Sequence, residues 1–452
     1  MKRNLLLIFI ALLSHVSIYG QQRIIPETAL KAYVHNDDPT WGWEVRNTYD
    51  MEDTKVYSLL FISQKWHGML WKHELIIFVP ESVKQDGALL FVDGGSVDDG
   101  IPKYSKEDNA LFIFLSALAN RNNALVCLLK QVPNQPLYGG LKEDALISYT
   151  LNEFRKDEDY SWPLLFPMTK TAYKAMDAIQ EFTTQQLDQK VSRFLVSGAS
   201  KRGWTTWLTG ALQDPRVEAI APMVIEMLNM PASLEYQKEI YGEYSEEIND
   251  YVKLEIPQAI NSEFGSAVVR MIDPYSYREK LTMPKMIFMG TNDPYWTVDA
   301  IKHYINDIPG HNLLHYVPNA GHGLGDKVQA FGALGAFFAH MLNKVEYPTC
   351  EWNLVEKGKN IDLKVKTSTD NLVGATLWKS VSDSRDFRKA TWTKNDLQLN
   401  AKNKSAVDAR IQYPKRGFQA FYVDLTYKDP HGDEYTVSTR TFVSDIKKVF
   451  VE

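Results

Sequence analysis

Cysteine is scarce in this chain: among 452 residues there are two, Cys127 and Cys350. Two cysteines cannot form the disulfide framework that holds small secreted scaffolds together. Cys127 lies in an apolar, strand-like run and is expected to belong to the core. Because spacing alone does not predict pairing, a Cys127–Cys350 bridge and two free thiols both stay open.

Motifs for metals and nucleotides are lacking as well. The sequence contains no His-Glu-x-x-His run, no Cys-x-x-Cys pair, no phosphate-binding loop and no dinucleotide fingerprint. His67 and His73 flank a strand-like segment without a third candidate ligand, so packing or surface roles are expected for both. We therefore expect neither a metal nor a cofactor.

An excess of positive charge is also missing. Lys and Arg number 50 against 56 Asp and Glu, which gives a net charge of −6. Mild acidity without a basic stripe argues against nucleic acid as a partner.

Long apolar runs are absent after the N-terminus. There, Lys2 and Arg3 precede an apolar run over residues 5–13, and small or polar residues follow as far as Gly20. This pattern is typical of a secretory signal peptide, which we predict for residues 1–20. No later run reaches the ~20 apolar residues that a membrane span needs. We expect an exported protein, periplasmic or secreted, without a transmembrane span in the mature chain.

Apolar residues make up 44% of the chain, enough for a large core. In the region 21–345, short apolar runs alternate with segments of helical periodicity, which predicts a mostly parallel sheet with helices on both faces. Predicted strands cover residues 55–62, 73–80, 88–92, 124–129, 194–196, 219–225, 285–290 and 313–317, and predicted helices begin at 171 and 204.

Two further regions differ in character from this alternation. Residues 228–280 read as helical and interrupt it, either as a lid over a site or as a peripheral insertion. After Pro348 the pattern changes to period two, for example over 361–365, 421–427 and 435–439. We predict that residues 350–452 form an antiparallel β-sandwich domain.

The six residues 198–203, Gly-Ala-Ser-Lys-Arg-Gly, follow a predicted strand and precede a predicted helix. A strand, a tight turn with serine at its apex and a helix is the sequence shape of a nucleophile elbow. Gly198 supplies the small residue needed two positions before Ser200, whereas Arg202 stands where a second small residue is usual and glycine comes one later. The alternative is an ordinary strand–helix turn, in which Gly and Ser are common.

A nucleophilic serine needs a histidine base, and the histidine needs an orienting carboxylate. Asp293 and His322 each lie in a loop just past a predicted strand, in the order Ser, acid, His. Because such loops meet at one edge of a parallel sheet, we predict a Ser200–His322–Asp293 triad. Glu226, at the end of the preceding strand, is the alternative acid.

An oxyanion hole is expected from the backbone N–H of Lys201 together with the loop at Gly94 and Gly95, which follows a predicted strand. A second group of residues is expected to line the substrate pocket. A charged Arg202 in that pocket would favour an anionic substrate, but a buried ion pair is the equal alternative. The predicted pocket residues are Arg202, Tyr295 and Trp296.

The string Ser-Gly-Ala-Ser-Lys-Arg-Gly-Trp-Thr-Thr-Trp around Ser200, with Asp-Pro-Arg-Val at 214–217, resembles the PhoPQ-activated pathogenicity-related proteins. So do residues 37–41, 71–74 and 386–392, so the resemblance covers nearly all the mature chain. Members of that family are similar to α/β-hydrolases and are largely exported, and the resemblance implies the same for this chain. It implies little about the substrate.

These observations predict an exported serine hydrolase that cleaves an ester or amide bond through an acyl-enzyme. Its substrate would be a small molecule, a peptide or a carbohydrate ester. The alternative is a secreted binding or signalling protein that keeps the hydrolase fold with little catalytic activity.

Overall fold

The computed structural model describes residues 24–106, 109–399 and 405–452. The signal peptide predicted for residues 1–20 lies outside these ranges. Of the helices within them, none combines the length and the apolar character that crossing a bilayer requires.

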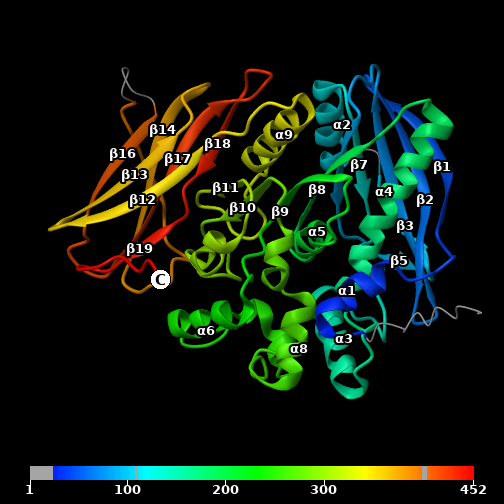
Figure 1. The fold of residues 1–452 in the computed structure, drawn as a ribbon, viewed down its shortest axis with the longest axis horizontal. Helices are drawn as coiled ribbons and strands as arrows, with labels where there is room; N and C mark the ends of the chain where they lie inside the picture. The colour runs from blue at the N-terminus through cyan, green and yellow to red at the C-terminus, as the bar shows by residue number, and fades with distance from the viewer. Residues whose placement is uncertain (1–23, 107–108, 400–404) are drawn as a thin grey trace, which may run out of the picture.

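One sheet runs through the whole molecule (Figure 1). Among the described residues it has fourteen strands in the order β1-β2-β3-β7-β4-β8-β9-β10-β11-β18-β17-β14-β15, with β19 paired to β17. The strands from β7 to β11 along this order are parallel to one another, and β1, β2 and β3 are antiparallel at one edge. Their bounds are β1 Gly42–Met51, β2 Thr54–Trp66, β3 Met69–Pro80, β4 Gly87–Val92, β7 Leu125–Leu129, β8 Arg193–Ala199, β9 Val217–Met223, β10 Lys285–Gly290 and β11 Asn312–Val317.

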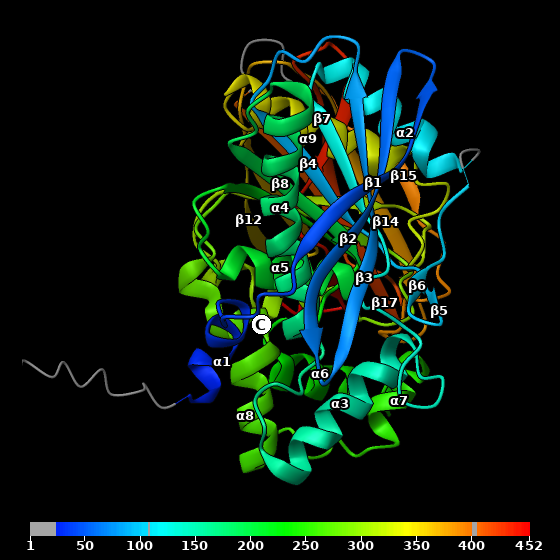
Figure 2. The same cartoon turned by 90° about the vertical axis from the view of Figure 1, so that its right-hand side faces the viewer.

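Each central strand is buried on both faces, because its side chains alternate between two apolar cores. Leu90 and Val196 belong to one core, and their neighbours Leu89 and Leu195 belong to the other. Helices α4 and α5 cover the first face and helices α2 and α9 the second; Figure 2 shows α4 and α2 on opposite sides of the strands. The helices of this part are α1 Pro26–Val34, α2 Ala110–Asn122, α3 Glu143–Asp157, α4 Leu165–Leu187, α5 Lys201–Ala211 and α9 Val328–Asn343.

The segment between β9 and β10 is helical, as its composition predicted. It packs against α1 and α3 below the sheet in the view of Figure 1. Its elements are α6 Met230–Tyr241, η1 Glu246–Ile248, α7 Asn249–Val252, α8 Glu263–Ile272 and η2 Pro274–Lys280. Two short 3-10 turns, η3 Ala300–His303 and η4 Ile305–Asp307, and the β5 Val97–Asp98 and β6 Ile101–Pro102 hairpin complete this part.

The strands after Pro348 are antiparallel, as predicted, but several of them continue the central sheet. Strand β18 pairs with β11 at Leu314 and Ser438, and the Tyr316 N–H donates to Ser438 Oγ at 3.1 Å. A second sheet, β12-β13-β16, packs on this antiparallel end through one shared apolar cluster. The bounds are β12 Cys350–Lys357, β13 Asn360–Thr367, β14 Leu372–Ser382, β15 Thr393–Asp396, β16 Ala406–Gln412, β17 Phe418–Lys428, β18 Glu434–Ser438 and β19 Phe442–Ser444.

This arrangement confirms the predicted fold class: a mostly parallel sheet with helices on both faces and antiparallel strands at its C-terminal end. The two cysteines lie on different sheets, Cys127 in β7 and Cys350 in β12, and both are free thiols. Burial raises the pKa of each thiol.

Candidate active site

Ser200 lies at the apex of a sharp turn between β8 and α5. Its backbone has φ 57° and ψ −123°, a conformation that costs a non-glycine residue about 1–3 kcal/mol. Two backbone hydrogen bonds hold it: the Ser200 N–H donates to Met223 O and the Trp204 N–H to Ser200 O, each at 2.9 Å. The turn therefore fixes the serine hydroxyl at the carboxyl edge of the sheet.

Two glycines allow this turn to pack closely. A Cβ at Gly198 would lie 2.8 Å from the backbone oxygen of Arg202, and one at Gly203 would lie 2.6 Å from Met223 O. Neither contact is possible for a real side chain, so both positions require glycine. The later glycine, displaced by one residue from the usual place, is the position at which α5 meets β9.

Asp293 follows β10 and His322 follows β11, and both lie at the sheet edge that carries Ser200. His322 Nε2 lies 2.8 Å from Ser200 Oγ, and His322 Nδ1 lies 2.8 Å from Asp293 Oδ2. Asp293 is itself held by the Tyr295 N–H, which donates to its Oδ1 at 2.9 Å. The structure thus brings together three side chains that the sequence separates by up to 122 positions.

The Tyr295 ring covers the histidine on one side, with ring centroids 4.2 Å apart. Asp293 is nearly buried, with 7% of its side chain exposed, whereas the His322 side chain is 24% exposed. The imidazole is therefore shielded and yet accessible at one edge, as a group that exchanges protons with a substrate must be.

In the described part of the chain, backbone N–H groups without an internal acceptor occur at Lys201, directly after Ser200, and in the Gly94–Gly95 loop after β4. Lys201 is the first residue of α5, so its N–H has no acceptor within the helix. Within the described ranges, the N–H groups of Gly94 and Gly95 donate to no other protein group. Asp93, which precedes these glycines, is held by Lys130 Nζ at 2.6 Å.

Arg202 does not line the cavity beside Ser200, which corrects the expectation that it helps to form the pocket. Its guanidinium makes two hydrogen bonds to the Glu143 carboxylate, at 2.6 and 2.7 Å, and a third to Val132 O. Burial raises the pKa of Glu143, but the bonds from Arg202 outweigh burial and lower it overall. Arg202 also lies against Gly94, so it ties α5 to α3 and to the Gly94 loop.

Glu226, the alternative acid, has a different partner. It follows β9 and accepts a hydrogen bond from the Tyr304 hydroxyl, with no bond to His322. Burial raises its pKa to about 8, with a smaller contribution from Asp293. It is therefore mostly protonated at neutral pH.

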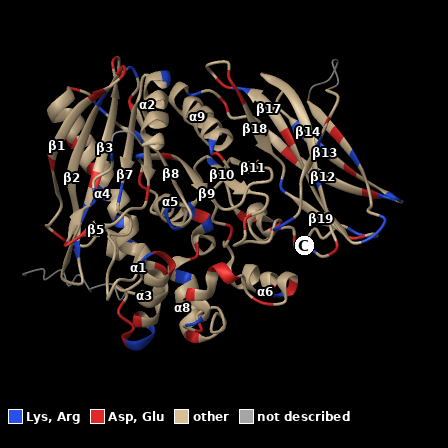
Figure 3. Cartoon of the chain, turned by 180° about the vertical axis from the view of Figure 1, so that it is seen from behind, with Lys and Arg blue, Asp and Glu red and all other residues tan. Residues whose placement is uncertain are grey.

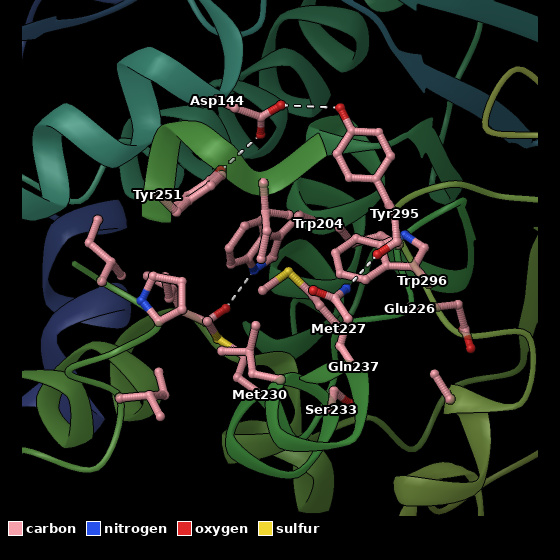
Figure 4. Close-up of a pocket in the computed structure, with 18 of the residues that line it drawn as sticks. Asp144, Trp204, Glu226, Met227, Met230, Ser233, Gln237, Tyr251, Tyr295 and Trp296 are labelled. Atoms are coloured by element: carbon pink, nitrogen blue, oxygen red, sulfur yellow. Dashed lines mark hydrogen bonds between the residues drawn. The ribbon is translucent and has the colours of Figure 1, made fainter. Parts of the chain in front are cut away.

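Sequence reasoning missed a polar cluster at the cavity mouth. Asp144 on α3 accepts from the Tyr251 hydroxyl at 2.9 Å and from the Tyr295 hydroxyl at 3.4 Å, as Figure 4 shows. It also accepts from Lys201 Nζ at 2.5 Å. The adjacent acids Glu143 and Asp144 thus meet the adjacent bases Arg202 and Lys201. Two adjacent acidic residues and two adjacent basic residues were visible in the sequence. Nothing in the sequence indicated that the two pairs contact each other.

An apolar cavity opens beside Ser200, between α5 and the helical segment after β9 (Figure 4). Tyr295 and Trp296, which the sequence suggested for a substrate pocket, line this cavity, and Glu226 and Asp144 are its carboxyl groups. Its free volume is about 60 Å³. The apolar residues that line it are Leu151, Trp204, Ile225, Met227, Met230, Leu234, Ile248, Ile256, Pro257, Ile260, Ile272, Trp296 and Ala300.

Charged residues of both signs are interspersed over the ribbon in Figure 3. Within the ranges that the structure describes, no group of three or more His, Cys, Asp or Glu residues could hold a metal ion.

Comparison with known proteins places the chain in a family. Residues 30–388 match the family described as PhoPQ-activated pathogenicity-related protein. Autocrine proliferation repressor protein A of Dictyostelium discoideum is 30% identical over 465 residues, which cover 93% of this chain and 90% of that protein.

Solved structures with a similar arrangement include two acetyl xylan esterases. Acetyl xylan esterase 1 from Thermoanaerobacterium sp. JW/SL YS485 is 17% identical over 71% of this chain and 94% of its own, with a TM-score of 0.46. The enzyme from Paenibacillus sp. R4 is 14% identical over 66% and 87%, with a TM-score of 0.44. On its family match and its sequence relative, the chain belongs to the PhoPQ-activated pathogenicity-related protein family.

Proposed function

We propose that this protein is an exported serine hydrolase that cleaves a carboxylic ester through an acyl-enzyme. One observation carries the proposal: His322 lies 2.8 Å from both Ser200 Oγ and Asp293 Oδ2, one contact at each ring nitrogen. A serine, a base and an orienting acid in this geometry are the machinery of acyl transfer. Export is proposed from the signal peptide in residues 1–20.

In the first half of the reaction, Ser200 Oγ attacks the ester carbonyl carbon while its proton passes to His322 Nε2. Asp293 accepts the Nδ1–H bond, which fixes the tautomer that leaves Nε2 free as a base. The carbonyl oxygen becomes an oxyanion, which the N–H groups of Lys201 and of the Gly94–Gly95 loop would stabilise.

The tetrahedral intermediate collapses when the carbon–oxygen bond to the alcohol breaks and His322 returns its proton to the departing oxygen. A water molecule then attacks the acyl-enzyme with His322 again as base, and this releases the carboxylic acid and restores Ser200.

An ester is favoured over a peptide by the carboxyl groups around Ser200. Recognition of a peptide's terminal amine would need a free carboxylate, but Asp144 is bound by Lys201 and Tyr251, and Glu143 by Arg202. Glu226 is the remaining candidate near the cavity, and its raised pKa keeps it largely neutral. The apolar cavity walls also suit a hydrocarbon better than a charged group.

A second candidate function is signalling by a protein with little catalytic activity. It is favoured by the name of the Dictyostelium discoideum relative, an autocrine proliferation repressor. In that case the hydrolase fold would serve as a scaffold for a surface that a receptor binds.

The test is hydrolysis of p-nitrophenyl esters by the mature protein and by its Ser200→Ala variant. Loss of the hydroxyl is expected to lower kcat by about 10⁶, because the triad acts as a unit. A variant that hydrolyses the esters as fast as the parent would reject the serine mechanism. If neither the parent nor the variant hydrolyses any of the p-nitrophenyl esters, the signalling function is favoured.

A further inference from the structure

A second, wider groove reaches His322 from the other face of the sheet. It is lined by His322 and by the first turns of α2 and α9, whereas the apolar cavity is lined by Ser200 and α5. Since α5 covers one face of the sheet and α2 and α9 the other, the cavity borders Ser200 and the groove borders His322 from opposite sides. The groove residues are Phe91, Asp93, Asn109, Ala110, Leu111, Phe114, Ala199, Met223, His322, Gly323, Leu324, Asp326, Lys327, Val328, Ala330 and Phe331.

The chemistry of acyl transfer distinguishes the two sides. The acyl carbon becomes bonded to Ser200 Oγ, so the acyl chain must extend into space that borders the serine. The alcohol oxygen must receive a proton from His322 Nε2, so the alcohol must leave through space that borders the histidine. In this structure Ser200 borders the cavity and His322 borders the groove.

We propose, on the basis of the serine hydrolase function above, that the two spaces divide the ester between them. The apolar cavity holds the acyl chain and the groove holds the alcohol half. The substrate class that follows is an ester of a slender aliphatic acid with a bulkier alcohol.

The cavity suits an unbranched acyl chain for two reasons. Its free volume of about 60 Å³ is smaller than the 540 Å³ of the groove, and its lining is mostly apolar. Several of its polar groups are already bonded: Gln237 donates to Tyr295 O at 2.7 Å, and Trp204 donates to Ile272 O at 2.6 Å. Among the described residues, Trp296 Nε1 and Thr297 Oγ1 also line the cavity and are buried without a hydrogen-bond partner. A hydrocarbon chain leaves the existing hydrogen bonds intact and packs against the apolar side chains that make up most of the lining.

The groove suits a larger alcohol with both apolar and polar parts. Phe114 and Phe331 stack at 4.4 Å between ring centroids and form an aromatic wall. Asp93, Asp326 and Lys327 add charged groups along the same groove. Such a lining can contact an aromatic or hydroxylated alcohol.

One leucine in each space offers a matched pair of variants. Leu234 on α6 borders the cavity and Leu111 on α2 borders the groove, and both are partly buried. Tryptophan at either position narrows its space, and alanine widens it at little risk to folding. Ile113→Ala, on the exposed side of α2, is the control outside both spaces.

Two substrate series separate the two halves of the ester. In the acyl series, p-nitrophenyl esters run from acetate to decanoate, and kcat/KM is expected to rise about three- to fourfold for each added methylene until the cavity is full. In the alcohol series, acetates of ethanol and benzyl alcohol are compared in a pH-stat. Leu234→Trp should lower the octanoate-to-acetate ratio about tenfold, and Leu111→Trp should lower the benzyl-to-ethyl ratio by a similar factor.

The alanine variants should leave each preference intact or extend it to longer groups, and Ile113→Ala should match the parent in both series. The assignment is overturned if Leu111→Trp changes the octanoate-to-acetate ratio and Leu234→Trp changes the benzyl-to-ethyl ratio. It is also overturned if neither variant changes either ratio. Labelling of Ser200 by a fluorophosphonate is measured in every variant. A protein that does not label argues against the serine hydrolase itself, whereas a labelled protein with the wrong preferences argues against this division alone.

Discussion

The ends of two neighbouring strands, β9 and β10, each carry a buried carboxyl group three residues past the strand. Asp293 and Glu226 border the same small cavity, and 6% and 5% of their surfaces are exposed. Yet Asp293 is held by N–H groups of His322 and Tyr295, whereas Glu226 accepts from the hydroxyl of Tyr304. A position just past a strand therefore places both carboxyl groups near the site. The hydrogen-bond partners of each carboxyl group decide which of the two can orient His322.

Among the carboxyl variants, the largest expected effect is the one that distinguishes Asp293 from Glu226. Asp293→Asn should lower kcat for ester hydrolysis by about 10⁴, because an amide no longer favours the histidine tautomer with its proton on Nδ1. Glu226→Gln should change kcat less than about threefold, since the side chain keeps its shape and does not contact His322. Steady-state kinetics on a p-nitrophenyl ester measures both, and a greater loss in the Glu226 variant would reverse the assignment.

Glu226 should instead control stability as a function of pH. Its native pKa of about 8 lies above the ordinary glutamate value of 4.5, so the folded state binds this proton more tightly than the unfolded state. The resulting stabilisation is present below about pH 4.5 and is lost progressively as the pH rises to about 8. Glu226→Gln removes this dependence.

The free energy of unfolding of Glu226→Gln, relative to the parent, should therefore increase between pH 5 and pH 8, by on the order of 1–4 kcal/mol. Urea titrations at several pH values measure this difference. A difference that stays constant across that range would show that Glu226 does not titrate as its burial requires.

A third carboxylate, Asp144, is expected to act at the cavity mouth with a smaller effect. Asp144→Asn leaves the Lys201 ammonium, whose side chain is 11% exposed, without the carboxylate that it contacts, which should cost about 1–3 kcal/mol of stability. Because Asp144 joins α3 to Tyr251 of the helical segment, KM for a long-chain ester should rise a few-fold, with a smaller change in kcat. Tyr251→Phe is the matched variant that removes one bond and keeps the ion pair, and its effects should be smaller than those of Asp144→Asn. A larger effect in Tyr251→Phe would mean that the charge pair contributes little.

The smallest effect is expected at an exposed ion pair on the β12-β13-β16 sheet, away from the active site. Lys366 and Glu351 pair across β13 and β12 at 3.0 Å, with about two-thirds of each side chain exposed, 69% and 66%. Exposed pairs of this kind contribute little, so Lys366→Ala should shift Tm by no more than about 1 °C and leave kcat unchanged. A change in kcat would indicate that the β12-β13-β16 sheet is coupled to the site.

The sequence was most informative where function depends on a local turn. Ser200, Asp293 and His322 each follow a strand closely, so predicting the parallel strands was enough to predict that all three lie at one edge of the sheet. Arg202 was harder, because choosing between a pocket and an ion pair required its partner, Glu143, 59 residues away. With 56 acidic residues in the chain, no local pattern selects that one.

The same limit applies to the C-terminal strands. Their period-two pattern predicted antiparallel pairing, but the contact between β18 and β11 joins segments that lie more than 120 residues apart. Local alternation predicts which face of a strand is buried, but it does not predict which strand pairs with it. The division of the chain into two domains near residue 350 stays a prediction.

The central claim is that Ser200 is a nucleophile activated by His322. Intact-protein mass spectrometry after exposure to a fluorophosphonate tests it most directly. The account predicts one added phosphonyl group per chain on Ser200, together with its absence in Ser200→Ala and strong slowing in His322→Ala. A properly folded protein that stays unmodified, or one labelled equally in all three forms, would contradict it.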